Sequence, residues 1–174
     1  MKFIGENVSL SNLTRKYFLL FINVDTVQMD RFISGGEYTV IDIEARLMWT
    51  RTDSMNDMEK WVNYQESADY IRNLCEKKFA GFDDWRLPTR DEMGTLYNES
   101  YSIKDKFEKD IHICECFSPG GGFSMIAQQV SGRMRTWVLN LRTGEYEQPD
   151  GLWTLTEAAR AVRSMHPDES IPGQ

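Results

Sequence analysis

The segment AGFDDWRLPTRDEM, at residues 80–93, places the tightest constraint on how this chain folds. Trp85 and Leu87 are two residues apart, so in an extended backbone both face one side, and we expect both in the core. Arg86 then faces the other side, where its planar guanidinium suits backbone carbonyls or a carboxylate. A direct contact of Arg86 with a ligand is the alternative. The carboxylates considered as partners are those of Asp42 and Asp84.

The second half of this segment carries a helix start. Pro88 is disfavoured inside a helix but suits the position just before one. Thr89 and Glu92 have the spacing of a capping box, in which each side chain accepts a hydrogen bond from the other residue's backbone. The sequence therefore predicts an extended stretch that leads directly into a helix packed on the core.

The rest of the chain predicts an α+β domain, because strands come first, then two helices, then strands again. Asn63 and Glu66 repeat the capping-box spacing at the start of the first helix. Residues 158–165 are ambiguous, since the alanines favour helix whereas Ala161-Val162-Arg163 suits a closing strand. The expected elements are strands 38–43 and 47–50, helices 63–75 and 89–97, and strands 111–117, 123–130 and 134–141.

The two ends differ in composition from the middle, so we expect a lead-in at 1–35, a domain at 36–165 and a disordered tail at 166–174. The lead-in contains one apolar run, Tyr17 to Val24, which is much shorter than the roughly 20 residues that span a bilayer. We interpret this run as a buried strand, with a signal peptide as the alternative.

Charge and cysteine content narrow the classes of partner and compartment. The net charge of −7 opposes binding to nucleic acid and to anionic lipid, and we expect no membrane insertion. The three cysteines do not describe a disulfide framework, and a reducing compartment is the simpler interpretation. We therefore expect a cytoplasmic protein, unless a leader has been trimmed from this chain.

Several motifs together resemble the C-terminal domain family of the Legionella collagen-like adhesin, called Lcl C-terminal. The upstream Asp42, the strand Leu47-Met48-Trp49 and the WRLPT segment fall in the family's order, over roughly residues 38–165. Farther on, the stretch 136–141 with Gly144 is similar to the family's tryptophan-containing strand and turn. The motif residues taken as structural are Asp42, Trp49, Trp85, Arg86, Pro88, Thr89 and Glu92.

The resemblance implies a C-type-lectin-like fold with a mixed or antiparallel sheet and two helices, related to the formylglycine-generating and sulfatase-modifying enzymes. It favours a strand at 161–163. It also implies a non-catalytic domain that binds a glycan or a protein, in an adhesin or host-interaction role, and allows homo-oligomers. One departure lies at Cys116-Phe117-Ser118-Pro119, where the family has an aromatic-Trp-Ser-Ser strand.

The candidate ligand-binding residues lie in the second half of the chain. Tyr146 and Trp153 are aromatic residues close to glycines, and with nearby arginines they suit recognition of a sugar or peptide. Both could instead fill the core. The loops 98–125 and 142–156 are expected to form the binding surface. The full candidate set is Tyr146, Trp153, Arg133 and Arg135.

A metal or thiol site is a second hypothesis. On a strand, His112, Cys114 and Cys116 would point the same way, and an imidazole with two thiolates suits copper or zinc. This would fit an enzyme related to the formylglycine-generating group. The alternative is a strand with Ile111 and Ile113 inside and His112 exposed, with no cofactor. A third hypothesis is an intracellular or phage-type structural interaction protein.

Overall fold

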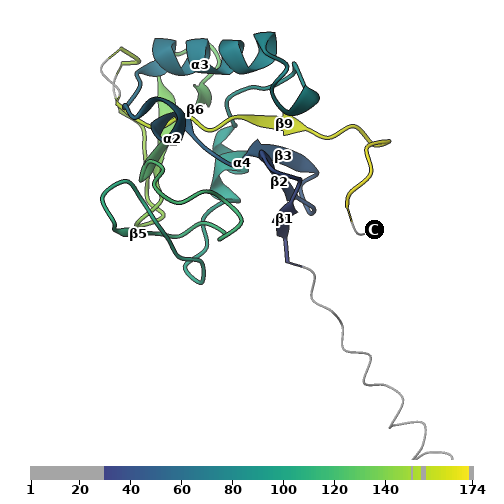
Figure 1. Ribbon diagram of the computed structural model, residues 1–174. Coiled ribbons are helices and arrows are strands. Elements are labelled where there is room, and N and C mark those ends of the chain that lie inside the picture. The colour runs from purple at the N-terminus through teal and green to yellow at the C-terminus, as the bar shows by residue number, and fades with distance from the viewer. Residues whose placement is uncertain (1–29, 150, 154–155, 173–174) are drawn as a thin grey trace, which may run out of the picture. The chain divides into compact units, whose positions relative to one another are not determined.

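Two antiparallel sheets form the framework of the domain in the computed structural model, which describes residues 30–149, 151–153 and 156–172 (Figure 1). The apolar run at 17–24 lies outside the described residues. The first sheet has the strand order β1-β2-β3-β9, so its last strand comes from the far end of the chain. Its strands are β1 Phe32–Ser34, β2 Thr39–Asp42, β3 Leu47–Thr50 and β9 Val162–Ser164.

The second sheet contains three strands in sequence order, and a small two-stranded sheet lies in the loop region before it. Between Ile126 and Gln129 the pairing of the first two strands shifts register, which marks a bulge. The three strands are β6 Ser124–Gln129, β7 Thr136–Asn140 and β8 Tyr146–Glu147. The two-stranded sheet pairs β4 Ile103–Lys104 with β5 Asp110–Ile111.

Both expected helices are present, and the α+β fold class is confirmed. Asn63 caps the first with Glu66 in a reciprocal capping box, and Thr89 caps the second with Glu92 in the same way. A further short helix between β3 and the first of these has no counterpart among the elements expected from the sequence. Within the described residues the helices are α2 Ser54–Met58, α3 Tyr64–Glu76 and α4 Arg90–Gly94, with a 3-10 turn, η1, at Phe79–Gly81.

The first sheet separates two hydrophobic clusters because neighbouring residues on a strand face opposite sides. Ile41 and Met48 face the cluster beneath α3, the helix that runs above β9 in Figure 1. Val40 and Trp49 face the other cluster, together with the core residues of α4 and β6. Trp49 is fully buried, and Asp42, also fully buried, pairs with Arg31 at 2.7 Å between Nη2 and Oδ2.

The WRLPT segment joins the two sheets. Trp85 and Leu87 are only 3% and 7% exposed and lie in the cluster beneath α3. The backbone of Arg86 pairs with Val162 of β9 on one side, and the carbonyl of Pro88 accepts a hydrogen bond from Gln128 N at 2.8 Å on the other. This segment therefore holds the last strand and the second sheet in one unit.

Arg86 binds a carboxylate, as expected, but not one of the two named from the sequence. Its guanidinium donates two hydrogen bonds to Glu92, at 2.7 and 2.6 Å, rather than to Asp42 or Asp84. The capping box explains the difference, since Glu92 is already drawn back to the helix start by the backbone N–H of Thr89. The bond from Arg86 then fixes the same carboxylate from its other side.

The end of the chain also differs from expectation. Residues 162–164 form a strand, but the segment that follows is packed rather than disordered. Glu169 receives two hydrogen bonds of 2.8 Å from Arg163, and Ile171 is only 6% exposed in the cluster beneath α3. We call residues 165–172 the C-terminal strap, because Arg46 donates to the carbonyls of His166 and Glu169 within it.

Candidate ligand-binding surface

A partly buried ion pair between Asp105 and Arg142 organises the loop that was expected to carry the ligand. The Asp105 side chain is fully buried, and it accepts hydrogen bonds from the backbone N–H groups of Phe107 at 2.7 Å and Lys109 at 3.1 Å. Arg142, in the turn after β7, donates to the same carboxylate from Nε at 2.8 Å and also from Nη2. The loop 98–125 is thereby fixed to the turn that begins the second expected loop.

An aromatic group covers this ion pair. Arg142 lies over the ring of Phe123 with 4.0 Å between Cζ and the ring centroid. Trp61 stacks on Phe107 at 6.4 Å, and Phe107 remains 52% exposed. Trp61 and Phe123 are partly buried, so the group shields the charge of Arg142 in part from water.

A second buried ion pair connects the loop to the sheet. Asp53 caps α2 through the N–H groups of Met55 and Asn56, and its other oxygen accepts from Gly122 N at 3.0 Å. Arg160 lies 3.2 Å from that oxygen, with the two side chains 1% and 3% exposed. Sequence reasoning missed this pair, and the one local signal was the Asp53-to-Asn56 spacing of a helix cap.

An arginine packed against two aromatic rings lies on a different part of the surface, at the start of α4. The guanidinium of Arg90 lies 4.8 Å from the ring centroid of Trp137 and 4.5 Å from that of Tyr146. The two rings meet edge to face, with 6.3 Å between their centroids. We call these three residues the Arg90 platform. The rings restrain the guanidinium, which also lies 3.4 Å from Asp91 Oδ1, and the Arg90 side chain stays 46% exposed, so a ligand can reach it.

A polar pocket of about 310 Å³ adjoins this platform. The start of α4, the end of β6 and the hairpin turn after β6 form it, so its walls come from elements that are themselves anchored in the core. It combines amide, hydroxyl and carboxylate groups with one aromatic wall. Its principal lining residues are Arg90, Asp91, Gln128, Gln129, Ser131 and Trp137.

The four residues expected to bind a ligand do not form one cluster. Tyr146 belongs to the platform, and burial raises the pKa of its hydroxyl group, which keeps it protonated. Arg133 and Arg135 are exposed in the hairpin turn that also contributes Ser131 to the pocket. Trp153 is 65% exposed but lies on another loop and does not line this pocket.

Arg90 and Trp137 were not among the expected ligand residues. Both were visible only as parts of structural motifs, Arg90 as the first residue of α4 and Trp137 as the tryptophan of a core strand. The signal that could have found them is position, because Arg90 follows the cap Thr89 and so must lie at the exposed end of the helix. The strand against which Arg90 packs depends on the tertiary fold, which a local sequence pattern does not indicate.

The structure corrects the expected strand at 111–117, since only Asp110–Ile111 pairs and the rest forms a turn. Phe117 N donates to the carbonyl of Cys114 at 3.0 Å, and Cys114 and Cys116 form a disulfide. His112 instead places Nδ1 2.9 Å from the carbonyl of Tyr101. Across the described part of the chain, His, Cys, Asp and Glu form no group of three or more that could hold a metal ion.

Comparison with known protein families agrees with the resemblance that the sequence motifs indicate. Residues 38–163 match the model of the Lcl C-terminal domain, which is well over half of the chain, and the chain therefore belongs to this family. No curated protein matches the chain. None of the helices in the described ranges is both long and apolar enough to cross a membrane.

Proposed function

We propose that the chain is a non-catalytic recognition domain with a C-type-lectin-like fold, and that it binds a glycan at the Arg90 platform and the polar pocket beside it. Family membership supports an adhesin-type domain, and the α+β architecture is compatible with the lectin-like relationship. The observation that carries the proposal is the exposed guanidinium of Arg90 held against Trp137 and Tyr146.

The chemistry of the pocket suits a sugar better than an apolar ligand. Sugar recognition combines an aromatic face, which packs on the C–H groups of the ring, with side chains that hydrogen-bond the hydroxyls. Trp137 supplies the face, while Gln128, Gln129 and Asp91 supply donors and acceptors around it. Arg90 adds charge-assisted hydrogen bonds, and restraint by two rings reduces the entropy lost on binding.

A glycan array with the purified protein tests this proposal, followed by titration of the strongest hit. We expect Arg90→Gln to weaken binding by about tenfold or more, because a hydrogen bond to a charged group contributes about 1.5–3 kcal/mol. Trp153→Ala is the matched control, since it removes an exposed aromatic residue outside the pocket. An array without hits, or a hit that Arg90→Gln leaves unchanged, would refute the proposal.

Two further parts of the proposal have their own measurements. Mass spectrometry of the glycan before and after incubation should show no change if the domain only binds. Light scattering of the purified protein measures whether homo-oligomers form, as the family resemblance allows. A cleaved or modified glycan would contradict the non-catalytic role without affecting the location of the site.

A further inference from the structure

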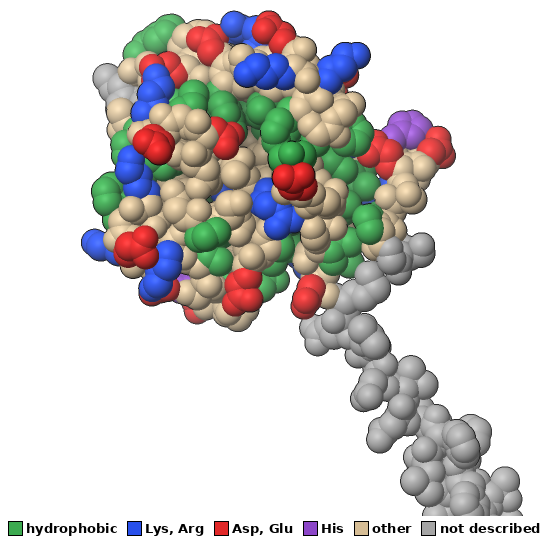
Figure 2. All heavy atoms as spheres, viewed as in Figure 1, with side chains coloured by type: hydrophobic (Ala, Val, Ile, Leu, Met, Phe, Trp, Pro, Cys, Tyr) green, Lys and Arg blue, Asp and Glu red, His purple; other side chains and the backbone are tan. Residues whose placement is uncertain are grey.

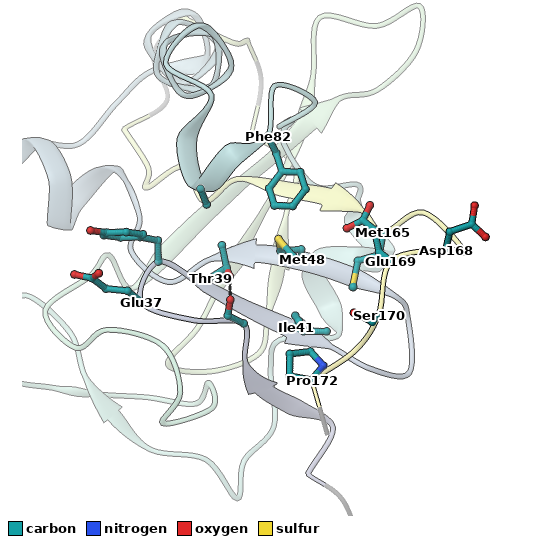
Figure 3. Close-up of a pocket in the computed structure, with 13 residues that line it drawn as sticks. Glu37, Thr39, Ile41, Met48, Phe82, Met165, Asp168, Glu169, Ser170 and Pro172 are labelled. Carbon is teal, nitrogen blue, oxygen red and sulfur yellow. Dashed lines mark hydrogen bonds between the residues drawn. The ribbon is translucent and has the colours of Figure 1, made fainter. Parts of the chain in front are cut away.

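A second pocket, of about 540 Å³, lies against the face of the first sheet that carries Ile41 and Met48 (Figure 3). Phe82 stands over these residues, and Met165 and Pro172 approach from the C-terminal strap. The volume falls within the roughly 300–1,000 Å³ of typical ligand pockets. The pocket thus has a mostly apolar floor between the first sheet, the segment 80–82 and the C-terminal strap. Neither the Arg90 platform nor the loop 98–125 contributes to it.

All charged side chains that line this pocket in the described part of the chain are acidic: Glu37, Asp168 and Glu169. Glu169 is matched by Arg163 through two hydrogen bonds of 2.8 Å. Asp168 has an exposed neighbour, His166, at 3.2 Å, which is charged only when protonated. The pocket therefore has an excess of negative charge near neutral pH, next to an apolar floor.

The protein already packs one cation against a wall of this pocket. The guanidinium of Arg163 lies over the ring of Phe82, with 3.9 Å from Cζ to the ring centroid, and it pairs with Asp84 as well as Glu169. An aromatic ring flanked by carboxylates is a favourable environment for a cation with an apolar stem. Tyr38, 52% exposed at the rim, offers a second ring of this kind.

The surface around the pocket has a matching character. Figure 2 shows hydrophobic side chains gathered in a band beneath the charged outer face of α3. Tyr38, which lines the pocket, packs edge to face on Phe79 at 5.7 Å, and Phe79 lines a neighbouring groove beside α3. A ligand longer than one side chain would therefore find apolar contacts beyond the acidic pocket.

We propose that this pocket binds a short extended segment of a partner protein in which a lysine or arginine stands next to an apolar residue. The apolar residue contacts Ile41, Met48 and Phe82, and cations on either side of it meet Glu37 at one rim and Asp168 at the opposite rim (Figure 3). Charge complementarity selects this occupant, because an acidic or neutral apolar segment would bring no positive charge to these carboxylates. This site is separate from the Arg90 platform, so each proposal can fail without the other.

Methionine methyl groups give a site-specific test by NMR. Met48 and Met165 line the pocket, whereas Met93 is buried in the other cluster and serves as the internal control. An end-blocked peptide of alternating lysine and leucine should shift the Met48 and Met165 methyl signals and leave Met93 in place. A glutamate–leucine peptide of the same length should shift none of them.

Charge removal tests Glu37 and Asp168, the two lining carboxylates that no arginine or lysine of the described residues neutralises. We expect Glu37→Gln with Asp168→Asn to lower the affinity for the lysine–leucine peptide by about 2- to 30-fold, the range expected for two exposed ion pairs. Glu44→Gln with Asp110→Asn removes the same charge at exposed positions outside both the pocket and the neighbouring groove, and should change little.

Three results would overturn this inference. The first is no shift of the Met48 and Met165 signals with the lysine–leucine peptide, and the second is equal shifts with the glutamate–leucine peptide. The third is equal affinity for 1,5-diaminopentane, which would make the pocket a small-amine site rather than a peptide site. Arg90→Gln should leave all peptide shifts unchanged.

Discussion

Asp53 and Arg160 form an ion pair in the interior, with 3.2 Å between Oδ2 and Nη2 and both side chains at most 3% exposed. Both residues also have further hydrogen-bond partners. Arg160 also donates to the carbonyls of Thr50 and Arg51, and Asp53 caps α2. Because these bonds join β3, α2 and the segment before β9, the pair connects distant parts of the chain at one point.

Asp53→Leu should therefore lower the free energy of unfolding by about 3–5 kcal/mol, the cost of leaving a buried charge without its partner. Chemical denaturation measures this value. Asp69→Asn breaks an exposed pair with Arg72 on α3 and should change the free energy of unfolding little. Similar effects of the two substitutions would show that the buried pair does not connect these segments as described.

The Asp105–Arg142 pair should govern the order of the loop 98–125 rather than the whole fold. Trypsin can cleave after Lys106 and Lys109, which are exposed in this loop. Asp105→Ala removes the acceptor of Arg142 and of two backbone N–H groups, so we expect cleavage there to accelerate by at least about tenfold. Glu108→Gln in the same loop is the control, and an unchanged rate for Asp105→Ala would contradict this role.

The C-terminal strap should respond to acid. Hydrogen bonds from Arg163 lower the pKa of Glu169 from 4.5 to about 2. A carboxyl group whose pKa is lower in the folded state stabilises that state above its unfolded pKa, and the contribution is lost as pH falls from about 4.5 toward 2. Hydrogen exchange of strap amides between pH 5 and pH 3, corrected for intrinsic rates, should show this loss of protection. Glu169→Gln should show lower protection at pH 5 and no such loss; an identical loss in that variant would assign the effect to another group.

The disulfide between Cys114 and Cys116 predicts a simple labelling result. Of the three cysteines, only Cys75 is free, and burial raises the pKa of its thiol. Denatured, unreduced protein should therefore take up one alkyl group, and reduced protein three. In the folded state Cys75 should react slowly, because less of it is thiolate. Three alkyl groups without reduction would show that the bond is absent from the purified protein.

Local signals in the sequence predicted the parts of the fold that depend on neighbouring residues. The capping boxes at Asn63 and Thr89 specify helix starts through residues three apart, and both helices begin there. The short helix α2 has only five residues, too few for an apolar periodicity, so the cap spacing from Asp53 to Asn56 was its one local signal. Its position depends on Asp53, whose partner Arg160 is 107 residues away.

The candidate site shows the same division. Tyr146 could be named from its residue type and the glycine near it, but its neighbours Arg90 and Trp137 come from a helix start and another strand. The strand expected at 111–117 failed because an apolar alternation at Ile111 and Ile113 also fits a turn whose apolar residues are buried. Pairing partners decide between these outcomes, and they lie outside any local window.

Strand β9 has a consequence for how the protein is made. Strand β9, residues 162–164, pairs with β3 on one side and with Arg86 on the other. The first sheet therefore lacks one of its four strands until these residues have been synthesised. During translation, Leu47 to Thr50 leave the ribosome more than a hundred residues earlier than their partner. During this interval one edge of β3 has no paired strand. A nascent chain stalled before residue 162 would expose this edge to chaperones or to other nascent chains.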